Sequence, residues 1–278
     1  MELVRDLTEI NAKLKVLKAK SKIAFVPTMG ALHAGHLALV KEAKKLADIV
    51  VVSIFVNPKQ FERIVDFNSY PNQLATDTKL LAELNVDFIL VPDAADFYPA
   101  NFKTKINLAY FNEMLCGKTR PGHLDGVALV LTKFFNILNP DFVLLGLKDY
   151  QQYFLVKTLV QDLNFSIEVV GVPTIREESG LAKSSRNLNL SKEQLEIAPQ
   201  LYKSLSKIKN DFTDLANLTQ LLATAQENLL CLGFTKIDYL EVLAADLGKV
   251  THDNYQTARI FVAAYLGEVR LIDNLELC

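Results

Sequence analysis

The stretch Ile23-Ala-Phe-Val-Pro27-Thr-Met-Gly30-Ala-Leu-His33-Ala-Gly-His36 decides the fold of this chain. Its first four residues form a short apolar run, which predicts a buried strand, and turn residues at 27–30 end that run. A helical pattern follows to about Ala47, and the β-branched run Ile49–Val56 predicts a second buried strand. Strand, helix and strand together predict a βαβ unit with parallel strands.

The alternation of helices and strands continues along the sequence before and after this unit. Apolar residues recur at helical spacing from Leu3 to Leu17, ahead of the first strand. Further helices are expected over residues 73–84, 127–138 and 149–163, and further strands over residues 87–91, 141–145 and 167–172. This alternation predicts an α/β fold in which helices cover both faces of a parallel sheet.

The pattern changes after Pro173. Two long amphipathic stretches, Lys192–Lys209 and Leu215–Leu232, precede three short expected strands, at residues 237–242, 258–265 and 269–272, with a hairpin turn at Gly267. We therefore expect two domains, a larger one over residues 1–174 and a smaller α+β domain over residues 175–278.

Composition limits the class of protein. Half of the 278 residues are apolar, and 30 basic residues against 32 acidic ones leave a net charge of −2, which disfavours disorder and a general affinity for nucleic acid. The three cysteines, Cys116, Cys231 and Cys278, are far apart, so neither a disulfide framework nor a thiolate zinc site is supported. The sequence shows no secretory signal or membrane-length apolar stretch, and we expect a soluble, cytoplasmic protein.

The carboxyl end of the first strand offers a candidate phosphate site. In an open α/β sheet, the N–H groups at the start of the following helix attract anions. His33 and His36 are three residues apart, so if the helix begins near them both imidazoles share one face and can reach one phosphate. Two alternatives stay open: a turn that only caps the helix, and zinc binding by the pair, for which no Cys or nearby Glu completes a ligand set.

Two other expected strands also end in polar residues. Asn57 and Gln60 follow one strand, where the amide of Gln60 would orient a hydroxyl group in an apolar pocket. Lys148, Asp149 and Gln152 follow another, where the lysine would place a positive charge near phosphate oxygens. The alternatives are an Asn-Pro turn and a capped helix with a solvated lysine.

Two loop segments complete the candidate site. Ser184 and Ser185, between Lys183 and Arg186, would form a flexible anion clamp or else an exposed linker. His123, the third of only four histidines, lies in the turn-rich segment Arg120-Pro-Gly-His-Leu-Asp-Gly.

Taken together, these segments resemble the pantothenate synthetase family, the pantoate–β-alanine ligases. Five family motifs stand in order along the chain, at Pro27–His36, Val52–Phe61, Arg120–Val127, Lys148–Gln152 and Ser184–Asn187. The resemblance implies a Rossmann-like, nucleotidyltransferase-type domain with a smaller C-terminal lid, ATP with Mg²⁺, and a homodimer. It also implies a two-step reaction, in which pantoate and ATP form a pantoyl adenylate and β-alanine then displaces AMP.

The resemblance carries roles to individual positions. It implies catalytic roles for His33, His36, Lys148, Ser184, Ser185 and Arg186. It implies ATP binding by Met29, Gly30, His36, Gly146, Lys148, Asp149, Lys183, Ser184, Ser185 and Arg186. Pantoate would be bound by Gln60, Gln152, Asn57 and Met29, magnesium by Asp77, and Tyr70 would border the site.

Some positions depart from the family pattern. Asn72 stands where arginine is common, Thr76 where an acid is common, Leu147 where Glu or Gln is usual, and Lys183 where an apolar residue is expected. Two competing functions stay open: another nucleotidyltransferase of the same fold, and a nucleotide sensor without activity. The ligase hypothesis requires His33, His36 and Lys148 to act on one triphosphate.

Overall fold

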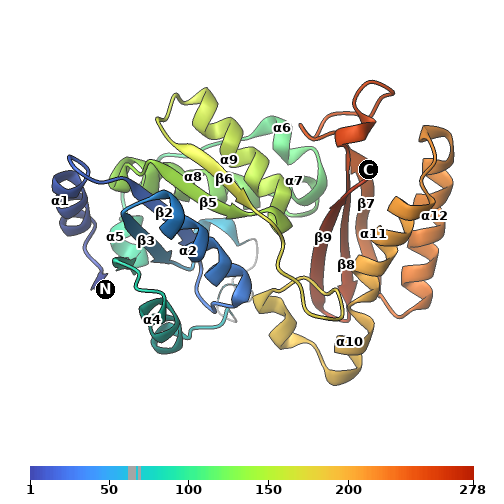
Figure 1. Ribbon diagram of the computed structural model, residues 1–278, viewed down its shortest axis with the longest axis horizontal. Helices are drawn as coiled ribbons and strands as arrows, with labels where there is room; N and C mark the ends of the chain where they lie inside the picture. Colours follow the sequence, from blue (N-terminus) through green and yellow to red (C-terminus); the bar gives the residue numbers. More distant parts are fainter. Residues whose placement is uncertain (62–66, 68–69) are drawn as a thin grey trace. The chain divides into compact units, whose positions relative to one another are not determined.

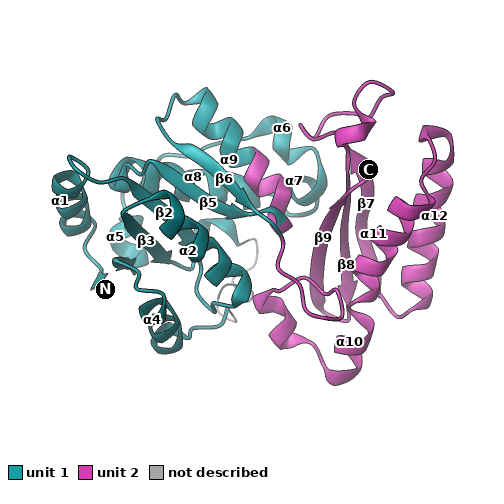
Figure 2. Ribbon diagram, viewed as in Figure 1, with its two compact units in different colours: residues 1–147, 155–173 teal, residues 148–154, 174–278 magenta. Residues whose placement is uncertain are grey.

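The computed structural model describes residues 1–61, 67 and 70–278, which form two compact units (Figure 2). Unit 1 comprises residues 1–147 and 155–173, and unit 2 comprises residues 148–154 and 174–278. The expected domain boundary followed residue 174 and left residues 148–154 in the first domain. In the structure this short segment, with Lys148 at its start, groups with the C-terminal part of the chain.

Unit 1 is built on a six-stranded parallel sheet (Figure 1). Its strands are β1 (Glu2–Val4), β2 (Ile23–Thr28), β3 (Ile49–Ile54), β4 (Phe88–Leu90), β5 (Phe142–Gly146) and β6 (Glu168–Val172). They lie in the order β1-β4-β3-β2-β5-β6, so β2 lies inside the sheet between β3 and β5. The predicted α/β class and the parallel βαβ unit are confirmed.

The helices of unit 1 pack on both faces of this sheet. They are α1 (Leu7–Leu17), α2 (Ala34–Leu46), α4 (Leu74–Glu83), α5 (Ala94–Phe97), α6 (Ala109–Asn112), α7 (Leu115–Thr119), α8 (His123–Leu138) and the later part of α9 (Tyr150–Asp162), with 3-10 turns η1 (Pro58–Gln60) and η2 (Leu147–Asp149) between them. Leu39 and Val40 of α2 and Leu81 of α4 share one core cluster with the sheet. On the other face, the Phe134 ring of α8 lies 5.3 Å from the Phe25 ring of β2.

One expectation about unit 1 was wrong in detail. The apolar pattern from Leu3 predicted helix, but residues 2–4 form β1, which pairs with β4, and the helix begins after Asp6, whose carboxylate accepts the N–H of Glu9. A three-residue strand is too short to show its own period beside a helix. The short helices α5, α6 and α7 were not predicted, because four or five residues carry no helical periodicity.

Unit 2 joins an antiparallel sheet to a layer of helices. Its strands are β7 (Lys236–Leu243), β8 (Arg259–Leu266) and β9 (Val269–Glu276), and its helices are α10 (Lys192–Ile197), α11 (Gln200–Asp211) and α12 (Leu215–Cys231), with 3-10 turns η3 (Ser185–Asn189) and η4 (Tyr255–Thr257). The single helix expected over residues 192–209 is broken at Pro199, which lacks an N–H. Gly267 forms the predicted hairpin turn with φ +60°.

This architecture places the candidate residues at the carboxyl ends of strands. Met29, Asn57 and Leu147 directly follow or closely follow β2, β3 and β5, three neighbouring parallel strands. Parallel strands end at the same edge of their sheet, and ligands of open α/β sheets bind along that edge. Among the described residues, no helix has both the length and the apolar character that a membrane crossing requires.

Candidate functional site

His33 and His36 cap helix α2 reciprocally. Nδ1 of His33 accepts the backbone N–H of Gly35 at 3.1 Å, and Nδ1 of His36 accepts the backbone N–H of His33 at 3.3 Å. The two ring centroids are 4.1 Å apart, so the predicted shared face is confirmed. Because each Nδ1 is an acceptor, each neutral ring carries its proton on Nε2. The helix cap and the phosphate site are thus compatible: capping uses one nitrogen of each ring and makes the other a donor.

The loop before these histidines is held by Asp77 of α4. Its Oδ2 accepts the N–H of Ala31 at 2.9 Å and its Oδ1 accepts the N–H of Leu32 at 2.8 Å. The loop needs this support because Gly30 and Ala31 both have positive φ, +82° and +50°. A Cβ at position 30 would lie 3.0 Å from Asp77 Oδ2, a tight contact that, with the positive φ, favours glycine here. With 1% of its surface exposed, Asp77 supports the loop, a role that the sequence did not reveal.

Asn57 is the centre of a buried amide cluster. Its Nδ2 donates to Gln60 Oε1 at 3.1 Å and to the carbonyl oxygen of Gly126 at 3.0 Å, and its Oδ1 accepts the hydroxyl of Tyr98 at 3.0 Å. Gln60 Nε2 donates in turn to the sulfur of Met29 at 2.8 Å. The structure therefore brings together three of the residues predicted for pantoate. Only 1% of Asn57 is exposed, so this residue orients Gln60.

The start of α8 fixes the backbone of Gln60. Arg120 Nη1 lies 3.0 Å from His123 Nε2, and His123 Nδ1 lies 2.9 Å from the carbonyl oxygen of Gln60. A guanidinium only donates, so Nε2 of the neutral imidazole accepts and the Nδ1 proton goes to Gln60. Gly126 lets the helix approach, since a Cβ there would lie 2.2 Å from the carbonyl oxygen of Lys59. His123, to which the sequence assigned no role, thus positions the amide residue.

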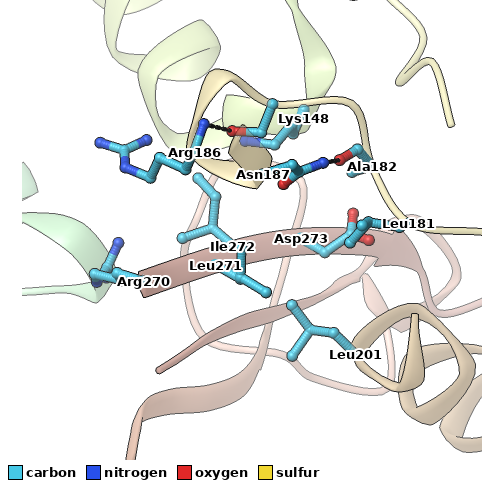
Figure 3. A pocket seen from close by; sticks show the side chains of 11 residues that line it. Lys148, Leu181, Ala182, Arg186, Asn187, Leu201, Arg270, Leu271, Ile272 and Asp273 are labelled. Carbon is cyan, nitrogen blue, oxygen red and sulfur yellow. Dashed lines mark hydrogen bonds between the residues drawn. The ribbon is translucent and has the colours of Figure 1, made fainter. Parts of the chain in front are cut away.

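Unit 2 holds a second group of candidate residues around one pocket. Lys148, Ser184 and Arg186 all line it, together with Asn187 and Arg270 (Figure 3). Ser184 caps the turn η3 by accepting the N–H of Arg186 at 3.3 Å. Figure 3 shows this turn and the Lys148 side chain above strand β9. The basic side chains and the Ser184 hydroxyl suit an anion, since the one carboxylate that also lines the pocket, that of Asp273, is paired with Arg176.

The remaining predicted residues are distributed between the two units. Met29, Gly30, His33, His36, Asn57, Gln60, Asp77 and Gly146 belong to unit 1, and Lys148, Asp149, Gln152, Lys183, Ser184, Ser185 and Arg186 belong to unit 2. Lys183 Nζ pairs with Glu177 at 2.5 Å, and Lys148 Nζ lies 3.8 Å from Asp149. The ring of Tyr70 lies 6.0 Å from that of Phe61. A shared action of His33, His36 and Lys148 spans the two units and stays a prediction.

The class of protein follows from the fold and the first site. A parallel sheet whose inner strand leads through a glycine loop into a helix capped by two histidines is a nucleotidyltransferase-type fold. The profile of the family described as pantoate-beta-alanine ligase matches residues 2–276. A pantothenate synthetase of Acinetobacter baumannii is 47% identical over 259 residues, which cover 93% of this chain and 91% of that protein.

Solved structures agree with the sequence relatives. The pantothenate synthetase of Thermus thermophilus has a TM-score of 0.91 at 39% identity, covering 100% of this chain and 99% of its own. The pantoate-beta-alanine ligase of Francisella tularensis, complexed with beta-gamma ATP and beta-alanine, has a TM-score of 0.85 at 39% identity, covering 100% and 98%. The chain belongs to the pantoate–β-alanine ligase family, and it is an enzyme that joins pantoate to β-alanine to form pantothenate.

Proposed function

We propose that this enzyme makes pantothenate in two steps through an acyl adenylate. A pantoate carboxylate oxygen attacks the α-phosphorus of ATP, the bond to the β,γ-phosphates breaks, and pyrophosphate leaves. The amine of β-alanine then attacks the carbonyl carbon, AMP leaves, and the amine loses a proton. A free carboxylate resists attack by an amine, whereas the mixed anhydride carries a good leaving group. The first task of the protein is therefore to stabilise negative charge around the α-phosphate.

The observation that carries this proposal is the reciprocal cap of His33 and His36. It fixes two Nε2–H donors on one side of a helix N-terminus, where the helix dipole also favours an anion. Neutral donors with a fixed direction stabilise charge as it develops without having to reorient. We assign these two imidazoles to the phosphates of ATP, together with the backbone of Gly30 and Gly146.

Pantoate binding is assigned to the amide cluster. Gln60 is held at its side chain by Asn57 and at its carbonyl oxygen by His123. A fixed amide in a largely apolar setting orients hydroxyl and carboxylate groups of a small acid. Met29 contacts this amide, and Gln152 of unit 2 is proposed as the second pantoate amide.

The pocket of unit 2 is assigned to the rest of ATP. Lys148 and Arg186 supply positive charge and Ser184 supplies a hydroxyl in this pocket, and the neighbouring Ser185, the first residue of η3, is proposed as a further donor for the leaving pyrophosphate. Asp149 and Lys183 are proposed for the nucleotide side of the same substrate. Asp149 lies 3.8 Å from the Lys148 ammonium, and Lys183 directly precedes Ser184 in the chain.

Magnesium is proposed to enter as part of the ATP substrate. Both oxygens of Asp77 accept backbone N–H groups, which fits a loop support better than a resident metal ligand. Within the chain outside residues 62–66, 68 and 69, no group of three or more His, Cys, Asp or Glu side chains is arranged to hold a metal ion. The magnesium role of Asp77 implied by the family resemblance therefore has no geometric support of its own.

We also propose a homodimer that works in the cytoplasm. The homodimer is proposed from the family resemblance. The cytoplasmic location is supported by Cys116, Cys231 and Cys278, which are all free thiols in the described chain.

Product analysis tests the proposed reaction. With pantoate, β-alanine and ATP, the enzyme should yield pantothenate, AMP and pyrophosphate in equal amounts. Formation of ADP and phosphate would contradict an adenylate and favour an acyl phosphate.

A further inference from the structure

Two consecutive polar residues lie buried in strand β9. Asp273 and Asn274 are 4% and 3% exposed, and they follow Leu271 and precede Leu275, which pack in the core of unit 2. Neighbouring residues of a strand point to opposite faces of the sheet. Buried polar side chains need hydrogen-bond partners, so the two residues make separate sets of contacts from one point of the strand.

Asp273 holds the base of the serine loop. Its carboxylate accepts Arg176 Nη1 at 2.6 Å and Arg176 Nη2 at 2.9 Å, and the same guanidinium lies 3.8 Å from the centre of the Tyr202 ring. Arg176 Nη1 also donates to the carbonyl oxygen of Gly180 at 3.1 Å, and Arg176 forms a β-bridge with Ala182. The loop that carries Ser184 and Arg186 is thereby joined to β9.

Asn274 holds the backbone of Lys148. Its Nδ2 donates to the carbonyl oxygen of Lys148 at 2.8 Å, and its Oδ1 accepts Arg259 Nε at 3.0 Å. Arginine cannot accept a hydrogen bond, so Oδ1 must face Arg259 and Nδ2 must face Lys148. The orientation of this amide is therefore determined by its partners.

Tyr150 makes two further contacts between the turn that contains Lys148 and the C-terminal part of the chain. Its hydroxyl donates to the carbonyl oxygen of Ala245 at 2.9 Å, and the Arg259 guanidinium lies 4.5 Å from the centre of its ring. Lys148 and Tyr150 are two residues apart, so both ends of this short turn contact the C-terminal part of the chain. These contacts give the physical reason why residues 148–154 group with unit 2.

We propose that Asn274 is a positioning residue for the reaction. By holding the carbonyl oxygen of Lys148, it fixes the Lys148 ammonium in the pocket lined by Ser184 and Arg186, whose loop Asp273 holds (Figure 3). Strand β9 thus assembles one cationic clamp for the triphosphate within unit 2, before ATP binds. This inference rests on the proposed role of Lys148 in adenylate formation.

The test is a double-mutant cycle of Asn274→Asp and Lys148→Ala. The aspartate keeps an oxygen for Arg259 but turns the donor toward Lys148 into a carboxylate oxygen, which repels the carbonyl. In the wild-type background, the kcat of pantoate-dependent exchange between pyrophosphate and ATP should fall by about tenfold to a hundredfold, the scale of a misplaced catalytic group. In the Lys148→Ala background, the same substitution should change the residual rate by less than about twofold, because no ammonium remains to be positioned.

A matched control uses Asn254→Asp. Asn254 also donates to a backbone carbonyl, that of Lys249 at 3.1 Å, and its Oδ1 also accepts an N–H, that of Thr251. Asn254 is not among the residues that line the pocket, and its substitution should leave the exchange rate unchanged. If the extra carboxylate beside Asp273 prevents folding, the neutral and shorter Asn274→Ser replaces it in the cycle.

The outcomes of this double-mutant cycle distinguish a failure of the role of Asn274 from a failure of the proposed role of Lys148. Equal losses from Asn274→Asp in both backgrounds, or no loss in the wild-type background, would show that Asn274 does not act through Lys148. Wild-type exchange by Lys148→Ala would instead overturn the role of the lysine itself.

Discussion

The Nδ1 atom of His36 accepts the backbone N–H of His33 at 3.3 Å, and Nδ1 of His33 accepts the backbone N–H of Gly35, so the two side chains together cap helix α2. In most capping boxes a glutamate or glutamine takes the place of His36. An imidazole at this position satisfies the helix with one nitrogen and keeps a directed donor on the other. Helix capping and the proposed contact to phosphate therefore use different atoms of one ring.

Substitutions of His36 distinguish the capping role of Nδ1 from the proposed phosphate-binding role of Nε2. His36→Asn keeps an oxygen near the place of Nδ1 and removes the Nε2 donor, whereas His36→Gln brings an amide nitrogen to the place of Nε2. We expect pantoate-dependent exchange to fall by about a hundredfold or more in His36→Asn and His36→Ala, and by clearly less in His36→Gln. Thermal unfolding of each variant checks the fold. A near-wild-type rate in His36→Asn would mean that the histidine only caps the helix.

The stability of the amide cluster around Asn57 should depend on pH through the hydroxyl of Tyr98. Burial raises the pKa of the Tyr98 hydroxyl above its ordinary value. The stability that its hydrogen bond to Asn57 contributes is therefore complete below the unfolded-state pKa of about 10 and is lost as the pH rises through that value toward the folded-state pKa. Urea unfolding at increasing alkaline pH should show a smaller loss of stability for Tyr98→Phe than for the wild type.

The exposed Tyr110 supplies the control for this experiment. Tyr110 is 53% exposed, and Tyr110→Phe should follow the wild-type curve. Near neutral pH, Tyr98→Phe should raise the KM for pantoate by several-fold, because Asn57 loses one of the bonds that orient it. Parallel alkaline curves for the wild type and Tyr98→Phe would contradict the assignment.

His123 is predicted to act through Gln60. In His123→Asn the amide nitrogen replaces the Nδ1 donor, and in His123→Gln it lies farther out, near the place of Nε2. The KM for pantoate should therefore rise more in His123→Gln, by about threefold to tenfold for a weakened buried hydrogen bond, with a smaller change in the KM for ATP. The exposed His252 provides control variants with the same two substitutions. Equal effects on both KM values would indicate a general structural defect.

Asp77→Asn distinguishes loop support from metal binding. The variant should lose about 2 kcal/mol of stability, the scale of a hydrogen bond to a charged group, and much of its activity, because one N–H of the histidine loop then faces an amide NH₂. A large excess of Mg²⁺ should not restore the activity. Asp87→Ala, which removes the side-chain acceptor of the Val50 N–H, should lower stability while sparing activity. Recovery of Asp77→Asn at high Mg²⁺ would support a metal ligand.

Much of the fold could be predicted because it follows from local patterns. The apolar runs at 23–26 and 49–56 and the helix between them required a parallel βαβ unit, and the turn at Gly267 required a hairpin. Strand β1 and the break at Pro199 were missed, because three residues show no period and the amphipathic pattern continues across the proline.

The candidate site residues could be named from the sequence, but the contacts that hold them could not. His33, His36 and Gln60 could be found from their chemistry and their places after strands. The partners Tyr98, Asp273 and Asn274 could not, because they lie far away in sequence from the residues they hold and carry no local signal. The same is true of the grouping of Lys148 with the C-terminal unit, which depends on contacts 126 residues apart.

Isotope exchange between pyrophosphate and ATP, measured with pantoate and without β-alanine, tests the central claim most directly. If the enzyme forms a pantoyl adenylate before the amine reacts, labelled pyrophosphate should enter ATP only when pantoate is present. The absence of exchange under these conditions, in a preparation that makes pantothenate when β-alanine is added, would contradict the two-step account.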